Sequence, residues 1–164
     1  MRGLKIAAIA SFSLLLVMLL LVGYLFLTAE VQVIDISAQG IPCENDPQAF
    51  ETLKTAVEEG TFQGTLFQKP LEWKDASEYV YLTYTIRLMN NCLVPIDMIE
   101  AQVVPQSTDI LQIGSYDVRS LDLKSEGEFQ VQVLAPKDTH AVREIIVTYY
   151  LWGVSGRVEA IFGQ

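Results

Sequence analysis

Cysteine and histidine are scarce in this chain of 164 residues, which contains two cysteines and one histidine. Structural zinc sites use four ligands, mostly Cys and His, so the sequence excludes a multi-ligand zinc site built from these residues. Basic residues are also few, because 11 Lys and Arg stand against 20 Asp and Glu, a formal net charge of −9. Proteins that bind nucleic acid carry a basic surface, so we expect no nucleic-acid partner.

Motifs for common chemistries are missing too. No glycine-rich phosphate loop or dinucleotide fingerprint occurs, so we expect no small-molecule cofactor. A catalytic triad would need the single histidine, His140, with Asp138 and Ser155, but Ser155 lacks the Gly-x-Ser-x-Gly spacing that exposes a nucleophile. The acidic stretch 44–46 is not followed by EF-hand spacing. We therefore expect no catalytic or metal-binding residue, and no enzyme.

A long apolar run dominates the N-terminal region. Residues 6–27 contain no charge, and as a helix they would be about 33 Å long, enough for a hydrocarbon core of about 30 Å. Arg2 and Lys5 precede the run, and Glu30 and Asp35 follow it. Positive charge favours the cytoplasmic side, so we expect the N-terminus inside and the remaining chain outside.

A cleaved signal peptide is the alternative interpretation. Its apolar region is usually 7–15 residues and ends in a small-x-small site, whereas here the run is longer and the best site, 27–29, begins with a bulky leucine. The sequence therefore favours an uncleaved signal-anchor. We expect a cytoplasmic N-terminus (1–5), a single transmembrane helix (6–27) and an extracytoplasmic domain (30–164) at the cell membrane.

The outer segment is acidic and contains one helix signal. From residue 30 onward there are nine basic and 20 acidic residues, a charge of −11. Asp46 before Pro47 is typical of a helix start, and Gly60 of a helix end. Apolar residues recur between them at helical spacing. We expect a helix of about 12 residues over 46–59, covering one end or edge of a sheet.

The rest of this segment has the period of two that is typical of strands. The strongest candidate places Val80, Leu82, Tyr84, Ile86 and Leu88 on one face. We expect a loop over 37–45 and strands near residues 31–36, 61–67, 79–89, 95–104, 107–113, 116–123, 129–133, 145–151 and 158–162. Parallel units would need helices between the strands, and the pattern has none.

These features predict a mainly β fold: an antiparallel immunoglobulin-like β-sandwich with one short helix, preceded by a single N-terminal transmembrane helix. The stretch YVYLTYTIRLMNNCLVPIDMI (79–99) joins a long alternating strand, an Asn turn and a further strand. In this it resembles fibronectin-type and late-embryogenesis-abundant type 2 sandwich modules, over residues 79–150. The resemblance implies a sandwich without catalytic residues, and the helix at 46–59 departs from it.

The two cysteines both fall in expected loops outside the apolar run. In an oxidising compartment Cys43 and Cys92 could form a disulfide that closes a loop of about 50 residues. We favour this candidate disulfide, and two buried free thiols are the alternative.

Aromatic side chains are the more informative set: Trp73, Tyr79, Tyr81, Tyr84, Tyr116, Tyr149, Tyr150 and Trp152. We favour core positions for these rings, Tyr150 and Trp152 included, covered by the 46–59 helix or a neighbouring strand. If Tyr149 faces the core, then Tyr150 and Trp152 share the other face of their strand. Exposed, those two rings would form a candidate aromatic surface for a sugar or a protein.

A membrane anchor joined to a sandwich without catalytic motifs is typical of a binding or assembly module at the cell envelope. We expect the membrane, through residues 6–27, and an envelope protein as partners. A membrane-tethered hydrolase of envelope polymer is one alternative, and it requires a cleft with convergent carboxylates or a nucleophile near His140. A carbohydrate-binding module is another, and it requires Tyr150 and Trp152 to be exposed and nearly coplanar.

Overall fold

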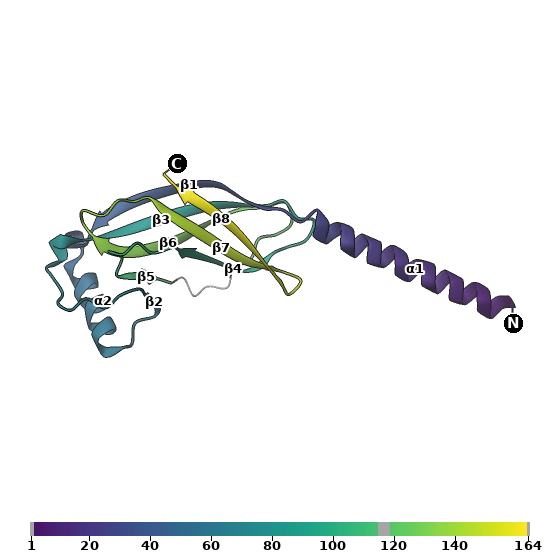
Figure 1. Ribbon diagram of the computed structural model, residues 1–164, viewed down its shortest axis with the longest axis horizontal. Coiled ribbons are helices and arrows are strands. Elements are labelled where there is room, and N and C mark those ends of the chain that lie inside the picture. The colour runs from purple at the N-terminus through teal and green to yellow at the C-terminus, as the bar shows by residue number, and fades with distance from the viewer. Residues whose placement is uncertain (1, 115–118, 164) are drawn as a thin grey trace.

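The computed structural model describes residues 2–114 and 119–163 (Figure 1). A long helix precedes a sandwich of two antiparallel sheets, with strand orders β1-β3-β6-β5-β2 and β4-β7-β8. The elements are α1 (Arg2–Leu27), β1 (Val31–Pro42), α2 (Pro47–Glu59), β2 (Gly64–Leu66), β3 (Tyr79–Asn90), β4 (Asp97–Val103), β5 (Leu111–Ile113), β6 (Glu126–Pro136), β7 (Arg143–Leu151) and β8 (Val154–Phe162), with short 3₁₀ turns at Cys43–Asn45 and Ala76–Glu78. The expected β-sandwich with one short helix is confirmed.

The helix α1 extends away from one end of the sandwich (Figure 1). The most apolar window of its stretch Lys5–Leu27 has a mean hydropathy of 2.7, and no side chain of that window is buried against the rest of the protein. A helix of this length and composition is long and apolar enough to span a membrane. We call the end of the sandwich that adjoins α1 the α1 end, and the opposite end, where α2 lies, the α2 end.

The main core lies between the two sheets. β3 pairs with β1 on one side and β6 on the other, so both of its edges are paired and its inward side chains face the second sheet. The residues expected on that face are the buried ones: Val80, Leu82, Tyr84, Ile86 and Leu88. They meet side chains of the second sheet, such as Ile145 and Val147 of β7.

A second core lies under α2, on the outer face of the larger sheet. The Asp46 carboxylate accepts a hydrogen bond of 3.0 Å from the amide of Ala49, and Gly60 ends the helix with φ of 72°. Phe50 of α2 is buried and stacks on Tyr79 of β3 at 5.2 Å between ring centroids. The sequence prediction of a capped helix that covers one end of the sheet is therefore confirmed.

Some boundaries differ from the expectation. β1 continues to Pro42, through residues expected as loop, because it pairs with β3 along its whole length. The strand expected at 107–113 is confined to β5. The strand expected at 116–123 lies partly outside the described residues, and of its remainder only Leu121 forms a bridge, to Ile96.

Candidate functional site

The candidate disulfide between Cys43 and Cys92 is wrong. Both thiols are free and buried. Cys43 follows Pro42, which pairs with Val80 at the α2 end, whereas Cys92 follows Asn90 at the α1 end. About ten residues of strand, at about 3.3 Å each, put the two cysteines roughly 30 Å or more apart, and a disulfide needs Cα atoms within about 7 Å.

The structure predicts thiols that are unreactive in the folded protein. Burial raises the pKa of the Cys43 thiol to about 11, and a hydrogen bond with Tyr81 only partly opposes this effect. Because the thiolate is the reactive form, we expect a chromogenic thiol reagent to modify neither cysteine of the folded full-length chain in detergent, and both after denaturant is added. The exposed variant Ser155→Cys should react at once as the positive control. Absence of free thiols in the denatured, unreduced protein would contradict the assignment.

The residues considered for a catalytic triad do not come together. His140 lies before β7 at the α2 end, whereas Ser155 pairs with Tyr150 near the α1 end. The nine residues of β7 separate them by roughly 30 Å. In the acidic stretch, Asp46 caps α2 and Glu44 pairs with Lys137 at 3.4 Å, so both carboxylates have structural partners.

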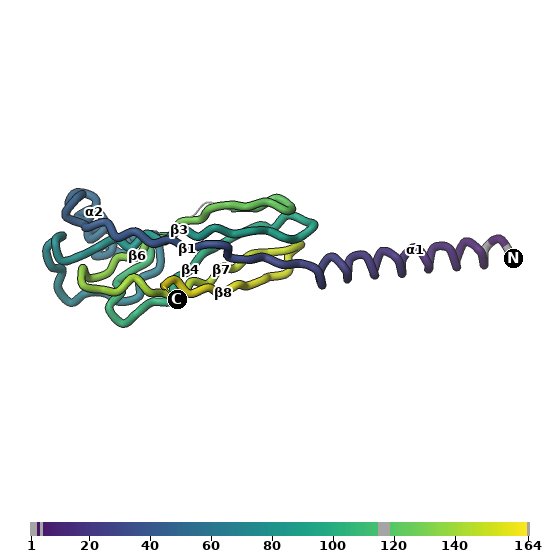
Figure 2. Tube along the Cα trace, turned by 90° about the horizontal axis from the view of Figure 1, so that it is seen from above, coloured from purple at the N-terminus to yellow at the C-terminus, as the bar shows by residue number. Residues whose placement is uncertain are grey.

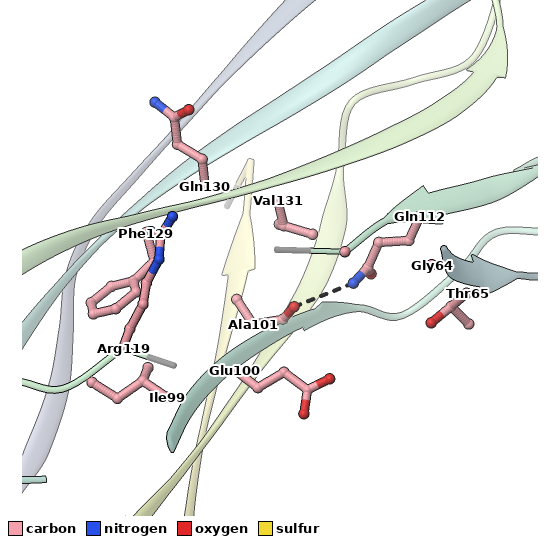
Figure 3. A pocket seen from close by; sticks show the side chains of 11 residues that line it. Gly64, Thr65, Ile99, Glu100, Ala101, Gln112, Arg119, Phe129, Gln130 and Val131 are labelled. Atoms are coloured by element: carbon pink, nitrogen blue, oxygen red, sulfur yellow. Dashed lines mark hydrogen bonds between the residues drawn. The ribbon is translucent and has the colours of Figure 1, made fainter. Parts of the chain in front are cut away.

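A cavity of about 340 Å³ opens between the edge of β4 and strands β5 and β6 (Figure 3). The buried side chain of Gln112 bridges the two sheets inside it. Its Nε2 donates to the carbonyl oxygen of Ala101 at 3.3 Å, and its Oε1 accepts from the amide of Val103 at 2.8 Å. The Arg119 guanidinium lies 5.6 Å from the centroid of the Phe129 ring.

The described lining of this cavity contains few groups that could act as acid, base or nucleophile. Glu100 is its single carboxylate, and it lies on a different side of the cavity from the Arg119 guanidinium (Figure 3). Glycoside hydrolysis uses two facing carboxyl groups, so this lining holds only half of such a pair. The polar groups of Gln112 are already occupied by backbone partners. The cavity therefore has no arrangement among its described residues that favours the hydrolase interpretation.

A groove of about 440 Å³ lies on the opposite edge of the sandwich, between β1 and β8. These strands are the terminal members of the two sheets and contact each other along this edge, side by side in both views (Figures 1 and 2). The groove is lined by Val33, Ile34, Asp35, Ile36, Ala160, Ile161, Phe162 and Gly163. Ile34 and Ile161 are exposed, so an apolar surface accompanies the two edges.

The backbone along this groove has one free side. β1 pairs only with β3 and β8 only with β7 within the described part of the chain. The register of β1 shifts between Val33 and Asp35, which places Ile34 in a bulge outside the ladder. Unpaired strand edges present rows of N–H and C=O groups that can pair with another chain. Sequence reasoning missed this groove because it depends on which strands end the sheets, which periodicity does not reveal.

Tyr150 and Trp152 are exposed, with 40% and 52% of their surface accessible. The expectation of a core position is wrong for these two rings, whereas Tyr79, Tyr81 and Tyr84 are buried as expected. Tyr149 faces the core only in part. Trp152 packs edge-on against Phe26 of α1, at 5.6 Å between centroids. Both rings of the candidate surface are therefore exposed, but Trp152 adjoins the apolar helix, and a binding role for the two rings stays a prediction. The expected core residue Tyr116 lies outside the described residues.

These features define a class: an antiparallel β-sandwich carrying an N-terminal helix long and apolar enough to cross a membrane. No protein-family model matches the chain, and no curated protein matches its sequence. A solved structure with some similarity is that of an uncharacterized β-sandwich protein from Clostridium difficile 630, with 14% identity, 80% of this chain and 85% of that chain covered, and a TM-score of 0.29. A likeness at that level carries no argument about function, and the resemblance of residues 79–150 to fibronectin-type and late-embryogenesis-abundant modules stays a prediction.

Proposed function

We propose that the chain is a single-pass membrane protein whose sandwich lies on the extracytoplasmic side and binds a protein partner at the cell envelope. The anchor is supported by α1, in which no side chain of the most apolar window is buried in the protein. The orientation is supported by Arg2 and Lys5 before the apolar stretch and by acidic residues after it.

The observation that carries the binding role is the pair of free edges along the β1–β8 groove. An extended peptide can add to an exposed edge, gaining affinity from main-chain hydrogen bonds and specificity from pockets for alternate side chains. Ile34 and Ile161 supply the apolar contacts beside these edges. The fitting partner is an extended segment of another protein with apolar side chains.

The net charge of the domain limits the kind of partner that fits. The segment from residue 30 onward has a net charge of −11. Such a field repels polyanions and speeds the approach of basic surfaces. The partner segment is therefore expected to be neutral or basic.

Site-specific photocrosslinking tests this role in intact cells. A photoreactive amino acid at Ile161, on the groove, is expected to trap a discrete protein because the partner strand lies against β8. The same amino acid at Leu71, fully exposed at the α2 end, is the matched control and is expected to trap none.

Two further observations make the experiment decisive. Ile34→Lys should abolish the Ile161 crosslink by placing a charge in the apolar part of the groove. Protease added outside intact cells should degrade the sandwich if the proposed orientation holds. Equal crosslinking from both sites, or none from Ile161, contradicts the groove as the binding surface, and a protease-resistant sandwich contradicts the orientation.

A further inference from the structure

Several exposed apolar side chains gather at the α1 end of the sandwich. They occupy the tips of three separate loops: Leu93 between β3 and β4, Leu123 before β6, and Trp152 with Val154 at the β7–β8 turn. These loops lie beside the C-terminal end of α1 (Figure 1). We call these four residues the apolar rim.

Hydrogen bonds fix the loops of the rim against the start of β1. The amide of Asn91 donates to the carbonyl oxygen of Glu30 at 2.9 Å, and the amide of Asn90 to that of Ser125 at 2.9 Å. The Lys124 ammonium donates to the carbonyl oxygen of Asn91. The two loops that carry Leu93 and Leu123 are therefore held together beside the start of β1, at the same end of the sandwich.

The β7–β8 turn brings Trp152 to the same level as the end of the helix. Its ring lies 5.6 Å from that of Phe26, which is in the last turn of α1. Only residues 28–30 separate α1 from β1, a reach of about 10 Å when fully extended. A bilayer crossed by α1 would therefore have its headgroup layer around the apolar rim.

The backbone at Trp152 is unusual for a tryptophan. Trp152 has φ of 50° and Gly153 has φ of 80°. Hairpin turns with two positive φ values favour Asn-Gly or Gly-Gly, because bulky side chains are disfavoured in this conformation. A large aromatic ring thus occupies a position where a small polar residue would fit the turn better, and it is directed to α1.

We infer that the apolar rim is a lipid-contacting surface that seats the sandwich in the headgroup layer beside α1. This inference rests on the membrane anchor of the proposed function. Tryptophan prefers the membrane–water interface, where its ring is apolar and its N–H can remain hydrated. The acidic balance of the domain gives no attraction to anionic lipids, so the contact is made by apolar groups with a zwitterionic surface and is insensitive to salt.

The two tryptophans of the chain make a direct test possible. Trp73 lies in the second core near the α2 end, against Phe50 and Tyr79. In the variant Trp73→Phe only Trp152 emits, and in Trp152→Phe only Trp73 emits. The full-length variants are placed in phosphatidylcholine vesicles in which some lipids carry bromine atoms near the headgroup. We expect Trp152 to lose roughly half of its emission or more and Trp73 to keep nearly all of it, because only an interfacial ring reaches the bromines.

A second pair of variants does not depend on either natural tryptophan. In the background Trp73→Phe/Trp152→Phe, a tryptophan is placed by Leu123→Trp on the rim or by Leu71→Trp at the α2 end. The rim position should be quenched and the distal one should not. Raising the salt concentration should leave both results unchanged.

The outcomes separate the inference from the proposal on which it rests. If the chain floats with the vesicles but Trp152 and the rim position of Leu123 are quenched no more than the distal reporters, the lipid-contacting rim is overturned while the anchor stands. If the chain does not float with the vesicles at all, the anchor itself fails and the inference fails with it.

Discussion

Replacing Arg143 with methionine is expected to lower the free energy of unfolding by about 3–5 kcal/mol, because it leaves a buried carboxylate without its partner. Arg143 begins β7 in one sheet, and Asp109 precedes β5 in the other. Two hydrogen bonds join them, Nε to Oδ2 at 2.9 Å and Nη2 to Oδ1 at 2.7 Å, and both side chains are essentially inaccessible. After Arg143→Met, the partner that remains to the Asp109 carboxylate among the described residues is the amide of Gln106, which donates to Oδ2 at 2.8 Å. Urea unfolding of the full-length chain in detergent measures the effect.

The matched control is Arg157→Met, which removes an exposed arginine paired with Glu159 on β8. Exposed ion pairs contribute about 0–1 kcal/mol, so this variant should unfold almost as the parent does. The double variant Asp109→Leu/Arg143→Met should recover part of the loss, since it removes both buried charges. If Arg143→Met lies within about 1 kcal/mol of Arg157→Met, the pair does not join the sheets as described.

Tyr84 lies near this ion pair, and its burial changes the pKa of its hydroxyl group. The Tyr84 hydroxyl donates to the carbonyl oxygen of Ala141 at 2.8 Å. Burial raises the pKa of Tyr84 to about 12, while Arg143 lowers it and Asp109 raises it. The protonated hydroxyl is therefore the form that the folded protein keeps. The contribution of Tyr84 to stability is fully present below the unfolded pKa of about 10 and is lost as the pH rises from there through about 12.

Elements with strong local signals were predictable from the sequence. The uncharged run at 6–27 becomes α1, the Asp46-Pro47 start and Gly60 stop frame α2, and the alternation from Tyr79 onward becomes β3. In each case the residues that form the element also carry its signal, as caps or as periodicity. The sandwich class follows from these signals, because short strands without intervening helices leave few other arrangements.

Features that depend on tertiary pairing were not predictable. The distance between Cys43 and Cys92 is set by the register of β1 on β3, and the sequence alone gives no register. The groove depends on β1 and β8 ending their sheets. For Trp152 the prediction of a core position was wrong. Tryptophan is highly buried on average, but here the β7–β8 turn directs the ring to α1 instead of the core.

The side chain of Asn90 organises the loops at the α1 end through hydrogen bonds. It is fully buried, and its side-chain Nδ2 donates to the carbonyl oxygens of Val94 at 3.0 Å, Asp122 at 2.9 Å and Leu121 at 3.3 Å. Its Oδ1 accepts from the amide of Cys92 at 2.9 Å. One amide thus holds together the two loops that carry Leu93 and Leu123 of the apolar rim.

We expect Asn90→Ala to lower the free energy of unfolding by about 2–4 kcal/mol, because the buried Cys92 N–H and the carbonyl oxygen of Val94 lose the Asn90 amide as their partner. The adjacent Asn91→Ala is the matched control, since Asn91 uses its backbone amide and carbonyl and, among the described residues, its side chain makes no hydrogen bond. Urea unfolding of the two variants in detergent compares them directly. Similar stability for both would show that the Asn90 amide does not organise this end.

The variant Asn90→Asp tests the same network through pH. The new carboxyl group keeps the acceptor for the amide of Cys92 but turns an oxygen toward the carbonyls that Asn90 now satisfies. Burial and these carbonyl oxygens favour its neutral form and raise its pKa in the folded state above that in the unfolded chain. Its stability relative to the parent should therefore be highest below the unfolded pKa of about 4 and fall as the pH rises through the folded pKa. The deficit of Asn90→Ala should not vary with pH, and an equally constant deficit for Asn90→Asp would contradict the hydrogen-bond donors assigned to this side chain.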